Sequence, residues 1–457
     1  MQTKENKMGV MPIDKLLISM SLPMMISMLV QALYNIVDSI FVSRINEYAL
    51  RAVSLAFPIQ SLMIAVAVGT AVGINAFLSK TLGEKDFEKA DIIAKNGIFL
   101  AIASYVAFAV IGLLVSRPFF ASQTEVLEVR EYGVTYLTIC CVAGMGIFLQ
   151  TTFERLLQAT GKTIYTMITQ STGAIINIIL DPIFIFALNM GVAGAAIATV
   201  IGQICGMLLA AYFNVKKNTD ITLRVKGFRP DWRLIGSIYA IGLPSVIMVA
   251  IGSVMTFLMN KILITYHSAH ETAATAFGIY FKLNSFIFMP VFGLNNGVVP
   301  IIAYNYGAQN RSRMVEAIKR SAIYASIIML LGIALFQAIP GTLLKIFDAT
   351  DTMLTVGIPA LRIISISFCM AGACIALGSS FQALGKSVYS MITSIVRQLV
   401  FLIPIAYVLA RYGASVGNSD LVWWSYPIAE VFSLILTLCF FRHVYKTTIA
   451  PLPEGRE

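Results

Sequence analysis

The sequence predicts an all-α integral membrane protein whose twelve transmembrane helices form two pseudo-twofold-related six-helix bundles. Of its 457 residues, 58% are hydrophobic and only 12% are charged, which is about half the charged share of a soluble domain. The apolar residues come in long runs, and a helix needs about 20 of them to cross the hydrocarbon core of a bilayer. These runs favour helices over the alternating strands of a membrane β-barrel.

Twelve apolar runs are long enough to cross a membrane, and each ends at a charged or a Pro- and Gly-rich break. They cover residues 16–42, 52–79, 93–116, 132–153, 163–188, 191–214, 234–265, 272–303, 321–340, 356–381, 387–410 and 421–441. The longest connector is too short to fold independently. We therefore expect an N-terminal six-helix lobe at 1–214, a cytoplasmic linker at 215–233 and a C-terminal six-helix lobe at 234–457.

The net charge of +10 is explained by the sidedness of the basic residues. The connectors on the side of both termini carry 23 Lys and Arg, whereas the connectors on the opposite side carry 6. Cytoplasmic loops carry such an excess in membrane proteins. We therefore expect a multi-pass protein of the cell membrane, with both termini in the cytoplasm and no nucleic-acid partner.

The chain contains an internal repeat. Residues 158–169 are QATGKTIYTMIT and residues 382–393 are QALGKSVYSMIT, with eight identical positions. The pair Leu22-Pro23 likewise matches Leu243-Pro244, which makes Pro23 a candidate hinge. Each half has six spans, so both enter the membrane from the same face as parallel repeats, an arrangement typical of transporters with a site near the midplane.

A polar stripe runs along the first span. Gln31, Tyr34, Asn35 and Asp38 follow one another at helical spacing on an otherwise apolar helix. An ionisable group near the centre of a span costs about 2.5–3.5 kcal/mol on insertion scales. Asp38 is therefore a candidate functional residue, and the other three are candidate residues of a polar cavity.

A second carboxylate lies in the fifth span. Asp181 follows Asn177 by one helical turn and precedes Pro182, which removes a backbone N–H and should loosen the helix. At the repeat offset the second half has Asn260 in place of Asp38, and apolar residues in place of Asp181. A structural requirement of the repeat would appear in both halves, so this asymmetry favours a functional role for the carboxylates.

The second half instead has other charged residues within its spans, namely Lys261, Lys282, Arg397 and Glu430. One interpretation is internal ion pairing, or snorkelling of long side chains toward the membrane surface. The alternative is a second polar relay or an anion-sensing site in this half. The sequence leaves both open.

Catalytic motifs are missing from the sequence, which has no HExxH, GxSxG or Walker A pattern. We therefore expect neither an enzyme nor a pump that hydrolyses ATP on this chain. His267 and His270 fall in a short outer connector, where a solvated loop is favoured over a metal site. The six cysteines lie within spans and are expected to be small packing residues.

Three features together resemble one family. They are the repeated Gln-Ala-x-Gly-Lys motif, the segment from Asn177 to Pro182 (NIILDP), and the segment from Gly191 to Thr199 (GVAGAAIAT). The chain resembles the multidrug and toxic compound extrusion (MATE) family over essentially its whole length, and most closely the DinF-like branch. The resemblance implies a MATE/MOP-type fold, in which two six-helix lobes form a V that opens outward.

The resemblance also implies a function, which is secondary-active export of organic cations or drugs in exchange for H⁺ or Na⁺. It implies no cofactor, since the coupling ion is transported, and no partner beyond the lipid bilayer and small organic cations; we expect a monomer. The implied coupling-cation ligands, which would be metal ligands only for Na⁺, are Asp38, Asn177, Asp181 and Thr199. Gln31 and Tyr136 match surrounding polar positions, and the C-lobe carboxylate pair of another branch is not evident.

The expected mechanism depends on neutralisation of the two carboxylates of the first half, Asp38 and Asp181. Two carboxylates in a low-dielectric cavity cannot both be ionised cheaply, so a proton or Na⁺ should neutralise the pair. We expect this to bend the first helix near Pro23 and to release a cationic substrate that competes for the same carboxylates. The alternatives are a lipid-linked precursor flippase and an anionic-metabolite exporter of the same superfamily. A flippase needs a large basic cavity, and the acidic first half argues against it.

Overall fold

A computed structural model of the chain describes residues 6–223, 228–347 and 349–454, and these residues form helices and connecting turns without a strand. The first half contains α1 (Lys7–Val10), α2 (Ile13–Ser43), α3 (Glu47–Gly83), α4 (Phe87–Gln123), α5 (Leu127–Val142), α6 (Met145–Ala159), α7 (Thr163–Pro182) and α8 (Gly191–Lys216). A π-helical turn, Ile183–Ala187, extends α7. Part of the expected linker, residues 224–227, lies outside the described residues.

The second half repeats this plan with more breaks. It contains α9 (Trp232–Tyr266), α10 (Glu271–Gly307), α11 (Arg311–Ala338), α12 (Pro340–Lys345), α13 (Asp351–Ser365), α14 (Phe368–Ala383), α15 (Ser387–Ile395), α16 (Ile403–Val416) and α17 (Ser425–Val444). The π-helical segment Val396–Leu402 joins α15 to α16, a 3₁₀ turn Ser419–Trp424 precedes α17, and a π-helical turn Tyr445–Ile449 follows it.

Ten helical segments in the described part of the chain are long and apolar enough to cross a membrane, and two bent pairs bring the number to twelve. The pairs are α5 with α6, bent by 43°, and α13 with α14, bent by 50°. The sequence predicted each pair as one unbroken run. The breaks fall in the fourth span of each half, so the bend belongs to the repeated unit.

Most helices extend beyond the apolar runs that predicted them, because polar caps prolong them past the hydrocarbon layer. The Asn46 side chain accepts the Ala49 N–H at 2.7 Å and starts α3 well before its apolar run. Asp231 does the same for α9, since its carboxylate accepts the Arg233 N–H at 2.9 Å. Such caps satisfy the N–H groups that the first turn of a helix leaves free.

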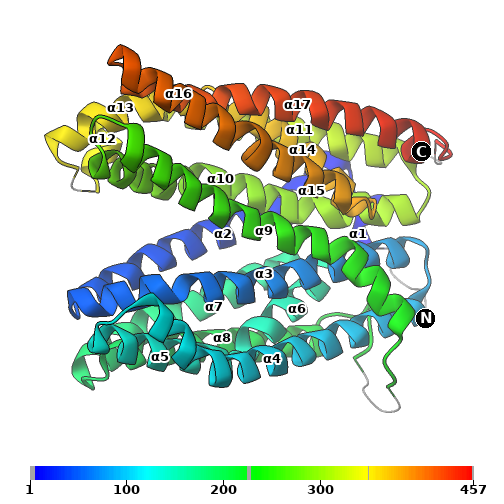
Figure 1. Cartoon of the computed structure of the whole chain (residues 1–457). Coiled ribbons are helices and arrows are strands. Elements are labelled where there is room, and N and C mark those ends of the chain that lie inside the picture. Colours follow the sequence, from blue (N-terminus) through cyan, green and yellow to red (C-terminus); the bar gives the residue numbers. More distant parts are fainter. Residues whose placement is uncertain (1–5, 224–227, 348, 455–457) are drawn as a thin grey trace.

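The two halves form two bundles that meet at one end of the molecule (Figure 1). Glycines allow this contact: a Cβ on Gly73 of α3 would lie 2.2 Å from the Ile238 carbonyl oxygen of α9. A Cβ on Gly297 of α10 would lie 2.5 Å from the Ser21 hydroxyl of α2. Both ends of the chain lie at this end, which we call the closed end, and the ribbons of the bundles diverge away from it (Figure 1).

The buried hydrophobic side chains form two clusters, and only one of them contains residues of both bundles. One large cluster of buried side chains includes Met8 and Leu78 of the first half together with Ile301 and Phe381 of the second. A second, smaller cluster, which includes Phe120 and Phe148, consists of first-half residues alone. The bundles therefore share a core at the closed end, while the far part of the first bundle has a core of its own.

Candidate functional site

Asp38 and Asp181 lie side by side in the first bundle. Asp38 comes from α2 and Asp181 from the last turn of α7, and their carboxyl groups are within hydrogen-bonding reach of each other. Asp181 is fully buried. One oxygen of each carboxyl group, Oδ1 in both cases, is buried and has no hydrogen-bond partner. The pair therefore has two buried oxygens that no N–H or O–H group of the described residues satisfies, and a proton shared between the carboxyl groups or a bound cation would satisfy them.

Asn177 connects this pair to α8. The surrounding groups are best satisfied with its amide nitrogen donating to Asp181 at 2.9 Å and its oxygen accepting the Thr199 backbone N–H at 2.8 Å. A glycine makes the approach possible, since a Cβ on Gly202 of α8 would lie 2.6 Å from the Gly173 carbonyl oxygen of α7. Close packing of α7 and α8 thus positions the Thr199 hydroxyl beside the Asn177 amide.

Aromatic side chains complete the cluster. The Tyr34 hydroxyl, from α2, hydrogen-bonds with Thr199 and lies near both carboxylates. Tyr136, from α5, is buried near Tyr34 and Asp38, and its hydroxyl accepts the Gln60 amide N–H at 3.2 Å. The structure therefore brings together six of the residues that the sequence singled out for the first half.

Two other predicted residues stand at the edge of this cluster. Gln31 and Asn35 share the stripe with Tyr34 and Asp38, but their own side chains are exposed. They extend the polar surface of α2 away from the buried carboxylates. The sequence missed Gln60 and Cys140, whose thiol lies 3.7 Å from the Gln60 amide nitrogen, because neither type of residue is unusual in a span.

The charged residues of the second half do not form one cluster. An Arg397 guanidinium nitrogen lies 3.4 Å from Oε2 of Glu430, so these two form an ion pair. Lys282 is exposed and its ammonium lies 5.9 Å from the centre of the Phe347 ring, while Lys261 is exposed on α9. The arrangement favours ion pairing for Arg397 and Glu430, and it does not join the lysines to them in a relay.

A buried carboxylate that the sequence missed lies elsewhere in the first bundle. Glu154 of α6 is only 3% exposed and accepts hydrogen bonds from Gln150, Thr169 and Gln170. The neighbouring Arg155 turns the other way and donates to Asn296 of α10 at 2.9 Å. Both residues lie beyond the apolar run 132–153, so Arg155 was counted with the basic residues of a cytoplasmic connector and Glu154 was not singled out.

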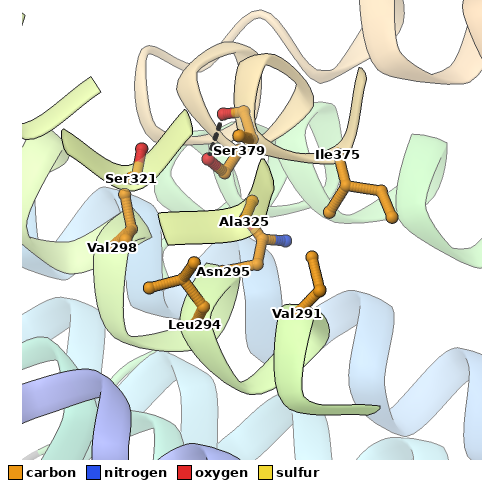
Figure 2. A pocket seen from close by; sticks show the side chains of 9 residues that line it. Val291, Leu294, Asn295, Val298, Ser321, Ala325, Ile375 and Ser379 are labelled. Atoms are coloured by element: carbon orange, nitrogen blue, oxygen red, sulfur yellow. Dashed lines mark hydrogen bonds between the residues drawn. The ribbon is translucent and has the colours of Figure 1, made fainter. Parts of the chain in front are cut away.

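A small cavity of about 10 Å³ lies in the second bundle between α10, α11 and α14 (Figure 2). Its volume suits a single water molecule. Asn295 lines it, and the buried Oδ1 of this residue has no hydrogen-bond partner. Within the described ranges no group of three or more His, Cys, Asp or Glu is placed to hold a metal ion.

His267 departs from its expected setting. The sequence predicted a solvated loop, but His267 is 4% exposed and packs near the Trp423 ring. Its Nδ1 accepts the Ala269 N–H at 3.1 Å. Burial lowers the pKa of His267 below its usual 6.5, and His270 adds to this effect, while Asp420 opposes it. The connector is thus part of the packed structure.

The chain was compared with known protein families and with curated proteins. The MatE family model matches residues 23–183 and 244–408, once in each half. The chain belongs to the MATE family. Two similar relatives are both named multidrug export protein MepA. The one from Staphylococcus haemolyticus is 30% identical over 95% of this chain and 93% of its own length, and the one from Staphylococcus aureus is 26% identical over 97% of each.

Solved MATE structures agree with this assignment. A multidrug resistance MATE transporter of the MOP superfamily in an outward-facing conformation has a TM-score of 0.92 at 26% identity, covering 98% of this chain and 99% of its own. A MATE structure described as straight gives the same values. One described as bent gives 0.86 at 26% identity, covering 95% and 97%. The chain is thus a multi-pass membrane protein with the two-lobe MATE fold.

Proposed function

We propose that this MATE chain exports organic cations and drugs across the cytoplasmic membrane in exchange for H⁺ or Na⁺. The observation that carries the proposal is the Asp38 and Asp181 pair, which is confined to one lobe and has two unpartnered oxygens. An inorganic cation or a cationic drug can neutralise the pair, so the two compete. The relatives named as multidrug export proteins support drugs as the cargo.

The same residues support a finer assignment within the family. The first-span carboxylate Asp38 and the motif from Asn177 to Pro182 are the basis for placing the chain in the DinF-like branch. The basic connectors and the common position of the two chain ends support cytoplasmic termini (Figure 1). The site lies within one lobe of one chain, and we propose that the chain works as a monomer.

The hinge of the mechanism is Pro23 of α2. Pro23 has no N–H for the Ser19 carbonyl four residues earlier, and that carbonyl instead accepts the Thr163 hydroxyl of α7 at 3.4 Å. Cation entry neutralises the Asp38 and Asp181 pair, α2 bends at Pro23, and the lobe loses its attraction for a cationic drug. In this structure α2 is one continuous helix from Ile13 to Ser43 that includes Pro23.

H⁺ and Na⁺ require different orientations of the Asn177 amide. With its nitrogen toward Asp181, the amide suits a carboxyl group that takes a proton on its free oxygen. Na⁺ prefers oxygen ligands, so the Asn177 amide would turn over to present its oxygen, and the Thr199 hydroxyl would join it. A membrane potential drives either ion inward with about 2.3 kcal/mol per charge per 100 mV.

The test is export of a fluorescent organic cation from proteoliposomes under separately imposed pH and Na⁺ gradients. Asp38→Asn keeps the shape of the side chain but removes its charge, and it should reduce gradient-driven exchange to less than about a tenth. Asp181→Asn should behave likewise. Lys261→Ala, a charge removal at an exposed position of the other lobe, should do less harm.

Exchange by Asp38→Asn at the wild-type rate, with wild-type dependence on pH or Na⁺, would show that coupling does not use this pair. Transport of organic anions in preference to organic cations would instead favour a metabolite exporter. Comparison of the two gradients identifies the ion, because a proton-coupled protein exchanges without Na⁺ when a pH gradient is present.

A further inference from the structure

Helices α2 and α7 run in parallel and are joined at three polar positions. The Ser19 carbonyl accepts from Thr163, the Ser27 hydroxyl donates to the Gln170 amide oxygen, and Asp38 faces Asp181. The first two pairs are separated by 144 and 143 residues in sequence, and the carboxylates keep the same register. Ser27 and Asp38 are eleven residues apart, or about 16 Å along the helix.

The middle position is anchored to Glu154. Gln170 uses its oxygen for Ser27 and donates its amide N–H to Glu154 Oε2 at 2.7 Å. Gln150 and Thr169 each donate to Glu154 Oε1 at 2.9 Å. Glu154 makes no ion pair within the described ranges, so neutral donors alone hold its buried carboxylate.

This chain of hydrogen bonds meets α2 next to the hinge. Ser27 is fully buried and lies one helical turn after Pro23, on the side of Asp38. The bond from Thr163 holds α2 one turn before Pro23. The segment of α2 that would swing on bending is therefore fixed to α7 immediately beyond its hinge, by a contact that depends on the orientation of the Gln170 amide.

We propose that Glu154 is a positioning residue of the transport cycle, which stabilises the straight form of α2 through Gln170 and Ser27 and thereby sets the cation concentration at which α2 bends. Neither Glu154 nor Ser27 belongs to the proposed coupling site. The inference rests on the proposed cation-driven bending and adds a residue outside the coupling site that opposes it.

The experiment measures bending directly in the full chain. Spin labels are attached to Leu33→Cys on α2 and Leu114→Cys on α4, both exposed positions, after the six native cysteines have been replaced. The distance between the labels is followed in nanodiscs as H⁺ and, separately, Na⁺ are titrated. Ser27→Ala should move the midpoint of the transition to about tenfold lower cation concentration, as loss of one buried hydrogen bond predicts.

Matched variants separate positioning from general damage. Glu154→Gln leaves three donors facing an amide, and it should shift the midpoint in the same direction as Ser27→Ala. Ser27→Thr keeps the hydroxyl and should stay near the wild type. Ser43→Ala is the control, because the Ser43 hydroxyl is exposed and donates only to the Ile40 carbonyl of its own helix.

Two negative outcomes are distinguishable. If the wild type bends with cation but Ser27→Ala and Glu154→Gln have the wild-type midpoint, the positioning role of Glu154 is wrong and the coupling site stands. If the wild type shows no cation-dependent change in distance, the proposed bending is wrong and the inference falls with it. A midpoint shift that Ser27→Ala and Glu154→Gln share, and that Ser43→Ala does not reproduce, supports the proposal, whereas a shift in Ser27→Ala alone overturns the role of Glu154.

Discussion

Asp38 and Asp181 differ from another buried carboxylate of the first bundle, Glu154, in how their oxygens are hydrogen-bonded. Each of the two aspartates has polar neighbours, yet the buried Oδ1 of each has no hydrogen-bond partner. Glu154, by contrast, has donors on both of its oxygens. A buried acceptor without a partner costs free energy, so the carboxylate pair gains more from an incoming cation than Glu154 does. This difference distinguishes the coupling role proposed for Asp38 and Asp181 from the positioning role proposed for Glu154.

The contribution of His267 to the stability of the folded protein should depend on pH. Burial lowers its pKa in the folded state below the 6.5 of the unfolded chain, so the folded state favours the neutral ring. The resulting stability is fully present above pH 6.5 and is lost as the pH falls below it. His267→Asn keeps an acceptor for the Ala269 N–H but does not titrate. Between neutral and acidic pH, the wild type should lose about 2 °C more in melting temperature than the variant.

Melting curves of both proteins in detergent, recorded between pH 7.5 and pH 5, give this difference directly. The comparison cancels groups that titrate equally in the two proteins. A wild type that becomes relatively more stable toward acidic pH would mean that attraction to Asp420, whose carboxylate lies 3.9 Å from the ring nitrogen, outweighs burial.

At the residue scale the sequence was informative where a residue type is rare in its surroundings. Asp38 and Asp181 stand out because a carboxylate in an apolar run is costly, and helical spacing adds Asn177. Glu154 did not stand out, because helix α6 continues past its apolar run and carries the residue inside the bundle. Hydropathy locates the lipid layer, and burial by neighbouring helices is a separate property that one sequence does not encode locally.

At the scale of elements, glycine decides how closely α3 and α10 cross at the closed end. A Cβ on Gly307 would lie 1.9 Å from the Lys80 carbonyl oxygen, and a Cβ on Gly83 would lie 2.0 Å from that of Tyr304. Both obstacles are backbone atoms, which cannot rotate away. Gly307→Ala should therefore force the helices apart and destabilise the protein by about 1–3 kcal/mol.

Gly278 of the same helix offers the control, since a Cβ there meets no atom within 4 Å. Gly278→Ala should be neutral or stabilising, because alanine favours helix by about 1 kcal/mol over glycine. Thermal unfolding of the two variants in the same detergent tests the pair. Equal melting temperatures would show that α3 and α10 can separate at no cost.

The elements themselves were largely predictable, and the exceptions are instructive. All twelve apolar runs correspond to helical segments, but the fourth run of each half is broken into two helices. Its polar residues are spread along the run and are too few at the bend to interrupt it, so hydropathy shows no break. Ser365 and Ser367 beside the second bend donate to carbonyls of their own turn, at 3.0 and 2.7 Å. Such bonds compete with regular helix, a signal too common in sequences to predict a bend.

At the scale of the whole molecule, the segment from Asn6 to Met11 joins the two bundles at the closed end. The Asn6 amide donates to the Thr160 carbonyl of the first bundle at 3.2 Å. From the second bundle, Arg313 donates to the Met8 and Met11 carbonyls, and Asn305 also donates to Met8. In the proposed transport cycle these contacts must separate before cargo can enter from this side, because they join the two bundles where the bundles meet (Figure 1).

Arg313→Ala removes two of these bonds and should loosen the closed end. Hydrogen–deuterium exchange of the full chain in nanodiscs should become faster in the segments around Met8 and Asn305, by about tenfold for contacts of this kind. Arg320 of the same helix is the control. It pairs with Asp14 at 3.4 Å, but both side chains are substantially exposed, and surface pairs contribute little.

Comparison of Arg313→Ala with Arg320→Ala therefore shows whether the closed end is held by specific hydrogen bonds or by the positive charge of α11. If the hydrogen bonds from Arg313 to the Met8 and Met11 carbonyls hold the closed end together, Arg313→Ala speeds hydrogen–deuterium exchange there and Arg320→Ala does not. Equal effects of the two variants would mean that net positive charge on α11 matters more than the specific bonds to Met8 and Met11. An unchanged Arg313→Ala would assign closure to the other contacts between the bundles, which include the shared hydrophobic core, the glycine crossings, the Asn305 bond to Met8 and the Arg155 bond to Asn296.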